Sequence, residues 1–460
     1  MPPMNQMSLS SLLHDAALRA SRYLSGLDGR SVAPTPDALR ALETLFEPLP
    51  EGPREAASVL ARLDAIGSPA TMASAGPRFF GFVIGGSLPA SLAASWLATA
   101  WDQNAGLRAT SPASAAFEEV VLRWLVDLLG LPPGTGGGFV TCATAANLTG
   151  LAAGRHAVLA REGWDVEAKG LFGAPEITVV LGDEVHASVQ KALAVLGLGR
   201  ERVVRVPVDG QGRMRADALP TLSARTIVCL QAGNVNTGSF DPAREIVAAA
   251  HEAGAWVHVD GAFGLWAGAA PARAHLWAGY PDADSWATDA HKWLNVPYDC
   301  GVVLCREPEA VRRAMSASGA YLVQGEAREP YQYTPDFSRR ARGVEVWAAL
   351  ASLGRSGVAD LVEGTCRHAV RFADGLRAAG YEILNDVVLN QVLVAFGDDA
   401  ATRRVASALQ ADGTCWCGTT VWQGRTAMRI SVSSWATTAE DVEQSLAAIV
   451  RAAGPAISAV

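Results

Sequence analysis

The chain has 460 residues, of which 50% are hydrophobic and 18% are charged, with a formal net charge of −8. This is the composition of an ordinary folded protein, and it excludes a disordered chain. The acidic balance gives no support for binding to nucleic acid or to an anionic membrane, since both call for basic patches.

Seven cysteines lie between Cys142 and Cys417, and several stand in apolar runs typical of buried strands. We expect small buried hydrophobes rather than disulfides, which favours a reducing cytoplasm. Cys415 and Cys417 lack a second pair of ligands at zinc-like spacing, so no metal site is predicted. The N-terminus lacks the pattern of a signal peptide, and no charge-free apolar run reaches 18 residues, so no membrane span is expected.

Residues 1–75 have helical periodicity interrupted by prolines. The breaks fall at Pro34, Pro36, Pro48 and Pro50, and proline ends or kinks a helix. We interpret this region as an N-terminal helical arm that packs on a partner subunit.

Residues 76–354 are expected to form a large domain, because short apolar runs alternate there with helical periodicity. The seven runs are 137–143, 177–183, 202–207, 226–233, 255–262, 283–289 and 300–306. Strands that are apolar on both faces favour a mostly parallel seven-stranded sheet flanked by helices, an α/β fold. Residues 355–460 change to a smaller α+β pattern and are expected to form a C-terminal domain.

Two segments carry the strongest chemical signal. Asp260 ends one apolar run, and Lys292 follows another within His-Lys-Trp at 291–293. Ligands bind at the carboxyl ends of strands in such sheets. A lysine in an apolar setting becomes a usable nucleophile for Schiff-base formation, and an aspartate can keep a pyridine nitrogen protonated. The alternatives are a helix-capping aspartate and a surface lysine.

These segments resemble the pyridoxal 5'-phosphate (PLP)-dependent group II decarboxylases, which act on aromatic amino acids, glutamate, histidine or diaminobutyrate. His-Lys-Trp is similar to the family's cofactor-lysine motif, and Asp-Gly-Ala at 260–262 is similar to its D-x-A motif. The resemblance runs from about residue 70 to the C-terminus. It implies fold type I, with PLP held by Lys292 as a Schiff base.

The segment at 139–151 is similar to the family's T-S-G-G-[ST]-E-A-N-L, in which a strand feeds a helix whose amides hold the cofactor phosphate. Ala143 and Thr144 match the phosphate positions, and Ala145 replaces the usual glutamate. An ordinary strand–helix junction is the alternative.

Further positions complete the cofactor site that the resemblance implies. His186, in a segment similar to [DE]-x-x-H-[SF]-S, would stack on the cofactor ring, unless it is a capping or surface histidine. Asn234 stands at a threonine position of the motif that contacts the ring hydroxyl. The remaining expected cofactor-binding residues are Ala262, Asp289 and His291.

The segment at 76–104 resembles the family's H-P-x-F-F region, at the mouth of the substrate pocket. The expected pocket residues are Phe79, Phe80, Phe82 and Arg108, with core packing as the alternative for the phenylalanines. This aromatic segment leans toward an apolar or aromatic amino acid.

The resemblance implies amino-acid α-decarboxylation that releases CO₂ and an amine. An acid must then protonate Cα, and Tyr331 and Tyr333 in the segment at 325–337 are the candidates, with ordinary packing as the alternative. Further on, Glu345 replaces a lysine that is usual in the family.

Other outcomes stay open on the same scaffold: transamination, C–C lyase or aldolase chemistry, and oxidation of the amine. A relative that binds but has lost its chemistry is a third class, and the joint presence of His186, Asp260 and Lys292 argues against it. The nature of the product, amine or carbonyl compound, separates the first two classes. The functional unit is expected to be a cytoplasmic homodimer with its active site at the subunit interface.

Overall fold

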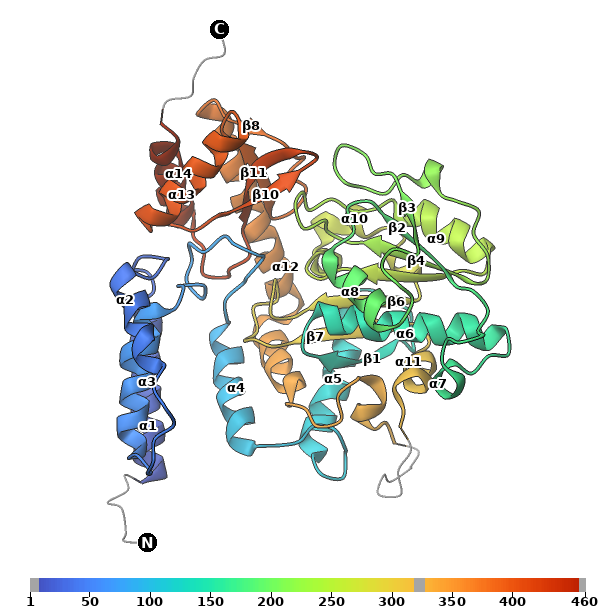
Figure 1. Ribbon diagram of the computed structural model, residues 1–460, viewed down its shortest axis with the longest axis horizontal. Coiled ribbons are helices and arrows are strands. Elements are labelled where there is room, and N and C mark those ends of the chain that lie inside the picture. The colour runs from blue at the N-terminus through green and yellow to red at the C-terminus, as the bar shows by residue number, and fades with distance from the viewer. Residues whose placement is uncertain (1–7, 318–326, 455–460) are drawn as a thin grey trace.

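The computed structural model describes residues 8–317 and 327–454. Figure 1 shows three parts: a column of N-terminal helices at one side, a large domain built on a sheet, and a smaller domain above the column. Among the described helices, none combines the length and the apolar character that a membrane crossing would demand.

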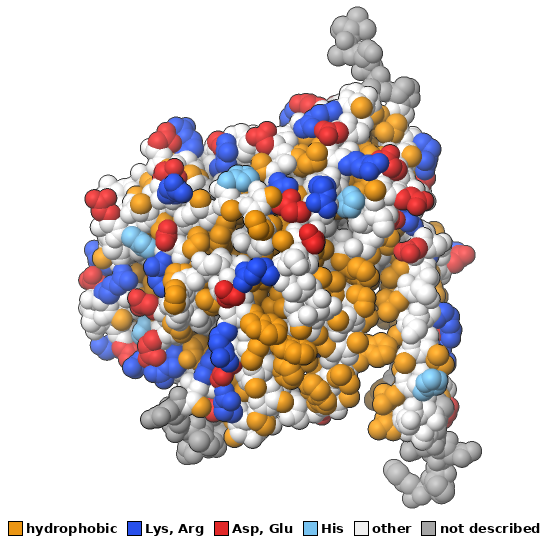
Figure 2. Space-filling view, turned by 180° about the vertical axis from the view of Figure 1, so that it is seen from behind, with side chains coloured by type: hydrophobic (Ala, Val, Ile, Leu, Met, Phe, Trp, Pro, Cys, Tyr) orange, Lys and Arg blue, Asp and Glu red, His pale blue; other side chains and the backbone are white. Residues whose placement is uncertain are grey.

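The arm consists of α1 (Leu9–Ser25), α2 (Pro36–Ala41) and α3 (Ala56–Ala70). None of these helices contains a buried residue. An ion pair between Arg19 and Asp64 joins α1 to α3. The arm therefore gains little burial from the rest of its own chain, and Figure 2 shows apolar side chains gathered on the neighbouring face of the large domain.

The large domain contains a seven-stranded sheet of order β1-β7-β6-β5-β4-β2-β3. Neighbouring strands are parallel except β7, which is antiparallel to both β1 and β6. The predicted α/β class and the mostly parallel sheet are confirmed. The strands are β1 (Gly136–Val140), β2 (Thr178–Gly182), β3 (Val203–Val206), β4 (Thr226–Gln231), β5 (Trp256–Asp260), β6 (Ser285–Asp289) and β7 (Gly301–Cys305).

Helices cover both faces of this sheet. The helices of the large domain are α4 (Pro89–Trp101), α5 (Pro112–Leu128), α6 (Ala143–Arg161), α7 (Val166–Lys169), α8 (Ala187–Val195), α9 (Ala243–Glu252), α10 (Ala274–Trp277), α11 (Pro308–Met315) and the first part of α12 (Arg342–Ala378). Alternate residues of a strand enter opposite cores: Ile227 and Cys229 of β4 pack with α6 and α8, whereas Val228 and Leu230 pack with α5 and α9. This explains why the strand reads as a continuous apolar run.

The smaller domain has an antiparallel sheet of order β10-β11-β9-β8, with α13 and α14 packed beside it. Its elements are β8 (Glu382–Ile383), β9 (Gln391–Ala395), α13 (Asp399–Asp412), β10 (Gly418–Trp422), β11 (Arg425–Ser431) and α14 (Ala439–Ala453). The expected boundary at residue 354 falls inside α12, where Gly354 has φ 61° and interrupts the helix. The core of the large domain includes residues of α12 on both sides of this kink, such as Leu350 and Val358, and from Ala369 onward the helix belongs to the core of the smaller domain. The domain boundaries themselves stay a prediction.

Candidate active site

The ends of three sheet strands bring the main polar residues together. Gln231 ends β4 and pairs in register with Asp260, the last residue of β5, while Asp289 ends β6, the next strand along. Lys292 follows three residues after Asp289, in the turn between β6 and β7. Because β4, β5 and β6 are parallel, these ends meet at one edge of the sheet, as the sequence predicted.

Lys292 is partly exposed, with 20% of its side chain accessible, and its Nζ lies 3.2 Å from Asp289 Oδ2. The backbone of the Lys292 turn packs closely against Gly85, where a Cβ would come within 2.1 Å of the Lys292 carbonyl oxygen. The segment around residue 85 therefore lies beside the lysine. An amine in this position, partly exposed and next to one carboxylate, is reachable by a small molecule.

His291 is buried beside Lys292 and supports the turn. Its Nδ1 accepts the backbone N–H of Cys300 at 3.0 Å, and its ring lies against that of Tyr298 at a centroid distance of 4.2 Å. Burial lowers the pKa of His291 below its ordinary value, against the opposing effect of Asp289. A neutral ring whose Nδ1 accepts a hydrogen bond fits a residue that positions the turn.

The N-terminus of α6 points into this edge of the sheet. The Ala143 N–H, which the sequence assigned to phosphate, donates to Asp289 Oδ1 at 2.5 Å. The next two amides, of Thr144 and Ala145, have no protein acceptor among the described residues. Free amides at the start of a 19-residue helix form an anion site, so this part of the structure fits a phosphate group.

Asp260 is buried and receives three hydrogen bonds. The donors are Asn147 Nδ2 at 3.1 Å, Ser188 Oγ at 3.2 Å and the Ala262 N–H at 3.2 Å. A carboxylate so surrounded is oriented by its neighbours and can receive one further donor, such as the protonated nitrogen of a pyridine ring. Ala262, an expected cofactor-binding residue, therefore contributes to the site through its hydrogen bond to Asp260.

His186 caps α8 and is linked to Asp260 through Ser188. Its Nδ1 accepts the Ser188 N–H at 3.2 Å and lies 2.8 Å from Ser188 Oγ. The side chain has solvent-exposed surface. Neighbouring protein atoms nevertheless desolvate the ring, which lowers the pKa of His186, and Asp260 opposes this effect. A neutral imidazole ring that is accessible in the site fits the predicted stacking on a cofactor ring.

Four side chains of the site were not among the predicted residues: Asn147, Ser188, Gln231 and Arg429. Arg429, on β11, donates to the Val235 carbonyl oxygen and acts electrostatically on His186; burial lowers its pKa. In the sequence, Asn147 stands in an apolar helical stretch and Arg429 in an apolar strand-like run, and a polar residue in such a run is a signal of a buried polar contact. The sequence did not reveal which partners they would meet.

Three predicted residues make no hydrogen bond to Lys292 or Asp260 in the part of the chain that the structure describes. Asn234 Oδ1 accepts the N–H groups of Asn236 and Thr237, which closes a turn, and its Nδ2 has no partner among the described residues. Tyr331 is buried and stacks on Phe337, whereas Tyr333 lies under the guanidinium of Arg328. The segment containing the tyrosines begins at Gly325, outside the described residues, and the proton-donor role stays a prediction.

The predicted pocket phenylalanines separate into two groups. Phe79 is buried in a small core that it shares with residues of the arm region, and Phe80 is buried in the core of the smaller domain. Core packing therefore describes both. Phe82 is 63% exposed, and its ring stacks on Trp416 at 5.5 Å, with Phe79 on Trp416 at 5.0 Å. Phe82 also has φ 54°, a left-handed conformation that is uncommon for a bulky residue. Only Phe82 of the three presents an accessible ring.

The arginines near this region are occupied by carboxylates. Arg108 pairs with Glu119, and its N–H donates to Glu329 at 2.7 Å. Arg78, which also lies in the pocket-mouth segment, pairs with Asp441 at 2.9 Å. A substrate-binding role for Arg108 stays a prediction, but its charge already has a partner.

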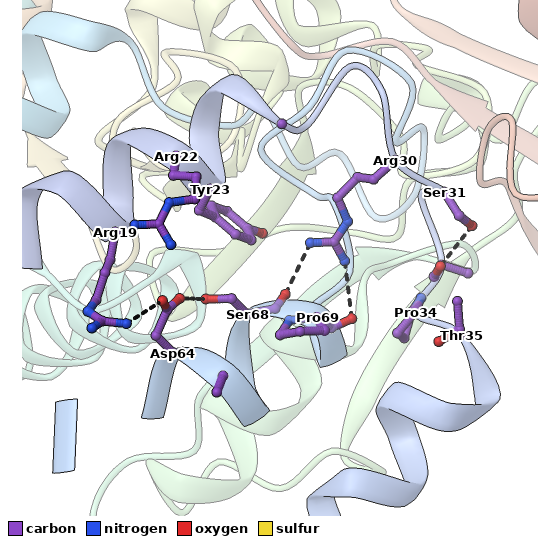
Figure 3. Close-up of a pocket in the computed structure, with 13 residues that line it drawn as sticks. Arg19, Arg22, Tyr23, Arg30, Ser31, Pro34, Thr35, Asp64, Ser68 and Pro69 are labelled. Carbon is purple, nitrogen blue, oxygen red and sulfur yellow. Dashed lines mark hydrogen bonds and ion pairs between the residues drawn. The ribbon is translucent and has the colours of Figure 1, made fainter. Parts of the chain in front are cut away.

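A separate pocket of about 480 Å³ lies within the arm, between α1 and α3 (Figure 3). Its arginines are largely engaged: Arg19 pairs with Asp64, and Arg30 donates to the carbonyl oxygens of Ser68 and Pro69. It contains none of the predicted site residues, and it is no part of the candidate active site.

The comparisons with known proteins agree with this geometry. The family model described as the pyridoxal-dependent decarboxylase conserved domain matches residues 39–397. The chain is 26% identical to tryptophan decarboxylase 1 of Oryza sativa subsp. japonica, covering 94% of this chain and 91% of that protein. It is 31% identical to an acidic amino acid decarboxylase of Mus musculus, over 62% of this chain and 54% of that protein. The solved structure of Oryza sativa TDC with PLP and tryptamine superimposes with a TM-score of 0.89 at 22% identity, covering 98% of this chain and 99% of that one.

Proposed function

The chain belongs to the pyridoxal-dependent decarboxylase family and is a PLP-dependent amino-acid decarboxylase, and we propose that its substrate has an aromatic or large apolar side chain. The observation that carries this proposal is the Phe82 ring, which is exposed beside the segment packed on Lys292 and backed by Trp416. An accessible aromatic ring of fixed orientation favours a flat, apolar side chain.

The charges near the pocket support the same substrate class. Arg78 and Arg108 are both paired with carboxylates of the chain, which leaves their charges less available to a carboxylate on the substrate's side chain. Arg429 is half-buried and its charge acts on His186, which suits the one carboxylate that every amino-acid substrate has. The named relatives act on tryptophan or on acidic amino acids, so their names alone do not select a substrate.

We assign the residues of the site as follows. Lys292 holds the cofactor, the amides of Thr144 and Ala145 bind its phosphate, and Asp260 accepts a hydrogen bond from its protonated ring nitrogen. His186 lies against the ring. The bound cofactor supplies an electron sink for the charge that develops at Cα as CO₂ leaves.

We further propose that the functional unit is a homodimer. Large apolar side chains are exposed on α1, where Leu9, Leu13 and Leu18 are 72%, 57% and 52% accessible, and on α4, where Leu97 is 57% accessible. Apolar surface of this extent is unusual on a monomer and marks an interface. The arm and α4 border the segment that carries Phe82, which supports a site at the subunit interface. All seven cysteines are free, which supports the proposed cytoplasmic location.

The test is a decarboxylation assay on the common amino acids, with products identified by mass spectrometry. We expect CO₂ and the amine from aromatic substrates. Phe82→Ala should raise KM for the best substrate by roughly 10-fold, because it removes the stacking surface. Phe172→Ala, at a ring that is 97% exposed elsewhere on the surface, is the matched control. An acidic or cationic best substrate would overturn the proposal, and a carbonyl product would favour one of the alternative reactions, such as transamination or oxidation of the amine.

A further inference from the structure

A line of buried polar side chains continues from Asp260 into the protein interior. Asn147 Oδ1 lies 2.9 Å from His258 Nε2, His258 Nδ1 lies 2.8 Å from Ser285 Oγ, and Trp256 Nε1 donates to that Oγ at 3.1 Å. All four side chains are essentially inaccessible. The line joins α6, β5 and β6 behind the carboxylate of the site.

The direction of every hydrogen bond in this line follows from its two ends. Asp260 Oδ2, as a carboxylate oxygen, only accepts, so Asn147 must present its NH₂ group there and its Oδ1 toward His258. Because Oδ1 also only accepts, His258 Nε2 must carry the hydrogen. The Ser285 hydroxyl then donates to Nδ1 and accepts from Trp256, which is a donor only.

The imidazole in this line is neutral at physiological pH. Burial lowers the pKa of His258 to about 4, despite the opposing effect of Asp260. A neutral ring with its hydrogen on Nε2 uses both nitrogens, and a second hydrogen on Nδ1 would displace the bond from Ser285. His258 therefore acts through one fixed tautomer rather than by titration.

The packing of α6 makes room for this arrangement. A Cβ at Gly150 would lie 2.5 Å from His258 Cε1, and one at Gly154 would lie 2.8 Å from Trp256 Cδ1. The two glycines are four residues apart and so share one face of α6. The helix that carries Asn147 is thereby seated directly on the rings of β5.

We propose that His258 is a positioning residue for decarboxylation: by donating to Asn147 Oδ1 it fixes the Asn147 amide, which holds the Asp260 carboxylate in place for the ring nitrogen of PLP. The proposal rests on the prediction that Asp260 pairs with that nitrogen. It goes beyond the proposed substrate class, because the line of hydrogen bonds is the same for any substrate.

The experiment compares His258→Phe and His258→Gln with Thr149→Val. Phenylalanine keeps the ring and removes the donor, whereas glutamine retains an amide N–H. Thr149 is buried on the same helix and its hydroxyl bonds only to the Ala145 carbonyl oxygen, so its loss perturbs α6 without touching the line. The readouts are kcat and KM, and the ¹⁵N resonance of labelled PLP bound to each protein, which reports ring-nitrogen protonation without substrate.

We expect His258→Phe to lower kcat by roughly 10-fold with KM nearly constant, and to move the ¹⁵N resonance toward the unprotonated ring. His258→Gln should recover part of both, and Thr149→Val should match the unaltered protein. An unmoved resonance in His258→Phe, or equal losses in the glutamine variant, would overturn the proposal.

Two further variants keep the result decisive. If His258→Phe does not fold, Asn147→Leu removes the same link, and the same two readouts decide. Asp260→Asn tests the premise: an unmoved resonance there would remove the proposal together with the role of Asp260. Because the resonance needs no substrate, failure of the aromatic-substrate proposal leaves this test intact.

Discussion

Helices α6 and α1 have similar lengths, 19 and 17 residues, but opposite surroundings. In α6, eleven residues are buried, and its polar side chain Asn147 finds two partners on β5, Asp260 and His258. In α1 no residue is buried, and its leucines face solvent. One chain therefore supplies the contacts around Asp260. The same chain supplies no surface that covers the exposed leucines of α1.

The site and the arm therefore depend on different contacts. The chemistry around Asp260 relies on contacts inside one chain and should respond to single buried substitutions. The arm relies on surface that its own chain does not supply, and should respond to changes in association.

Lys292→Ala should have the largest effect and should leave the arm untouched. Without the amine that binds the cofactor, we expect kcat to fall by about 10³-fold or more. The molecular mass in light scattering should not change. Lys191→Ala, at an exposed lysine of α8, is the control for loss of a lysine. Borohydride reduction followed by peptide mapping should label Lys292, and a label on another lysine would contradict the assignment.

Asp260→Asn should lower kcat by about 10²-fold with KM nearly constant, because the charged partner of the ring nitrogen acts mainly in the transition state. Steady-state kinetics check this. Asp241→Asn is the matched control, since Asp241 is equally buried but accepts backbone N–H groups of Met214 and Gln231. We expect this control to lose stability and to keep its kcat. A change in cofactor affinity alone at Asp260 would make it a structural residue.

His258 should make the folded chain sensitive to acid. Its pKa is about 4 when folded and 6.5 when unfolded, so below pH 6.5 the unfolded state binds the extra proton and stability falls. Relative to His258→Phe, the unaltered protein should lose about 2 kcal/mol of unfolding free energy between pH 7 and pH 5.

Urea denaturation at the two pH values measures this difference. The pKa of Asp241, raised to about 6 by burial, gives the opposite trend between pH 4 and 6, but it is present in both proteins and cancels. Equal pH dependence in the two proteins would mean that His258 is not buried as described.

Leu13→Glu should have the smallest effect on the folded chain and a clear effect on association. Leu13 is 57% exposed, so the unfolding free energy of a single chain should change by less than about 0.5 kcal/mol. Light scattering should shift from a dimer toward the 48.1 kDa of one chain. Val195→Glu, at an equally exposed apolar residue of α8, should leave the mass unchanged. A variant at Leu13 that stays dimeric would place the interface elsewhere.

The fold and the centre of the site could be predicted because their signals are local. Seven apolar runs between helical stretches predict a mostly parallel sheet, and residues at strand ends, such as Asp260 and Lys292, must meet at its edge. Asn234 and Tyr331 were assigned by position in a motif. Their side chains turn to a local loop and to Phe337, which sequence spacing does not fix.

The sequence by itself determined the α/β sheet and the decarboxylase family and predicted the cofactor lysine, since each depends on order and spacing along the chain. Tertiary structure alone decided which polar atoms pair. Asn147 meets His258 across 111 residues of chain, and Arg429 donates to the Val235 carbonyl oxygen across 194 residues. Such contacts arise from how α6 and β11 pack against the sheet domain, and a buried polar group takes whichever partner that packing brings within reach.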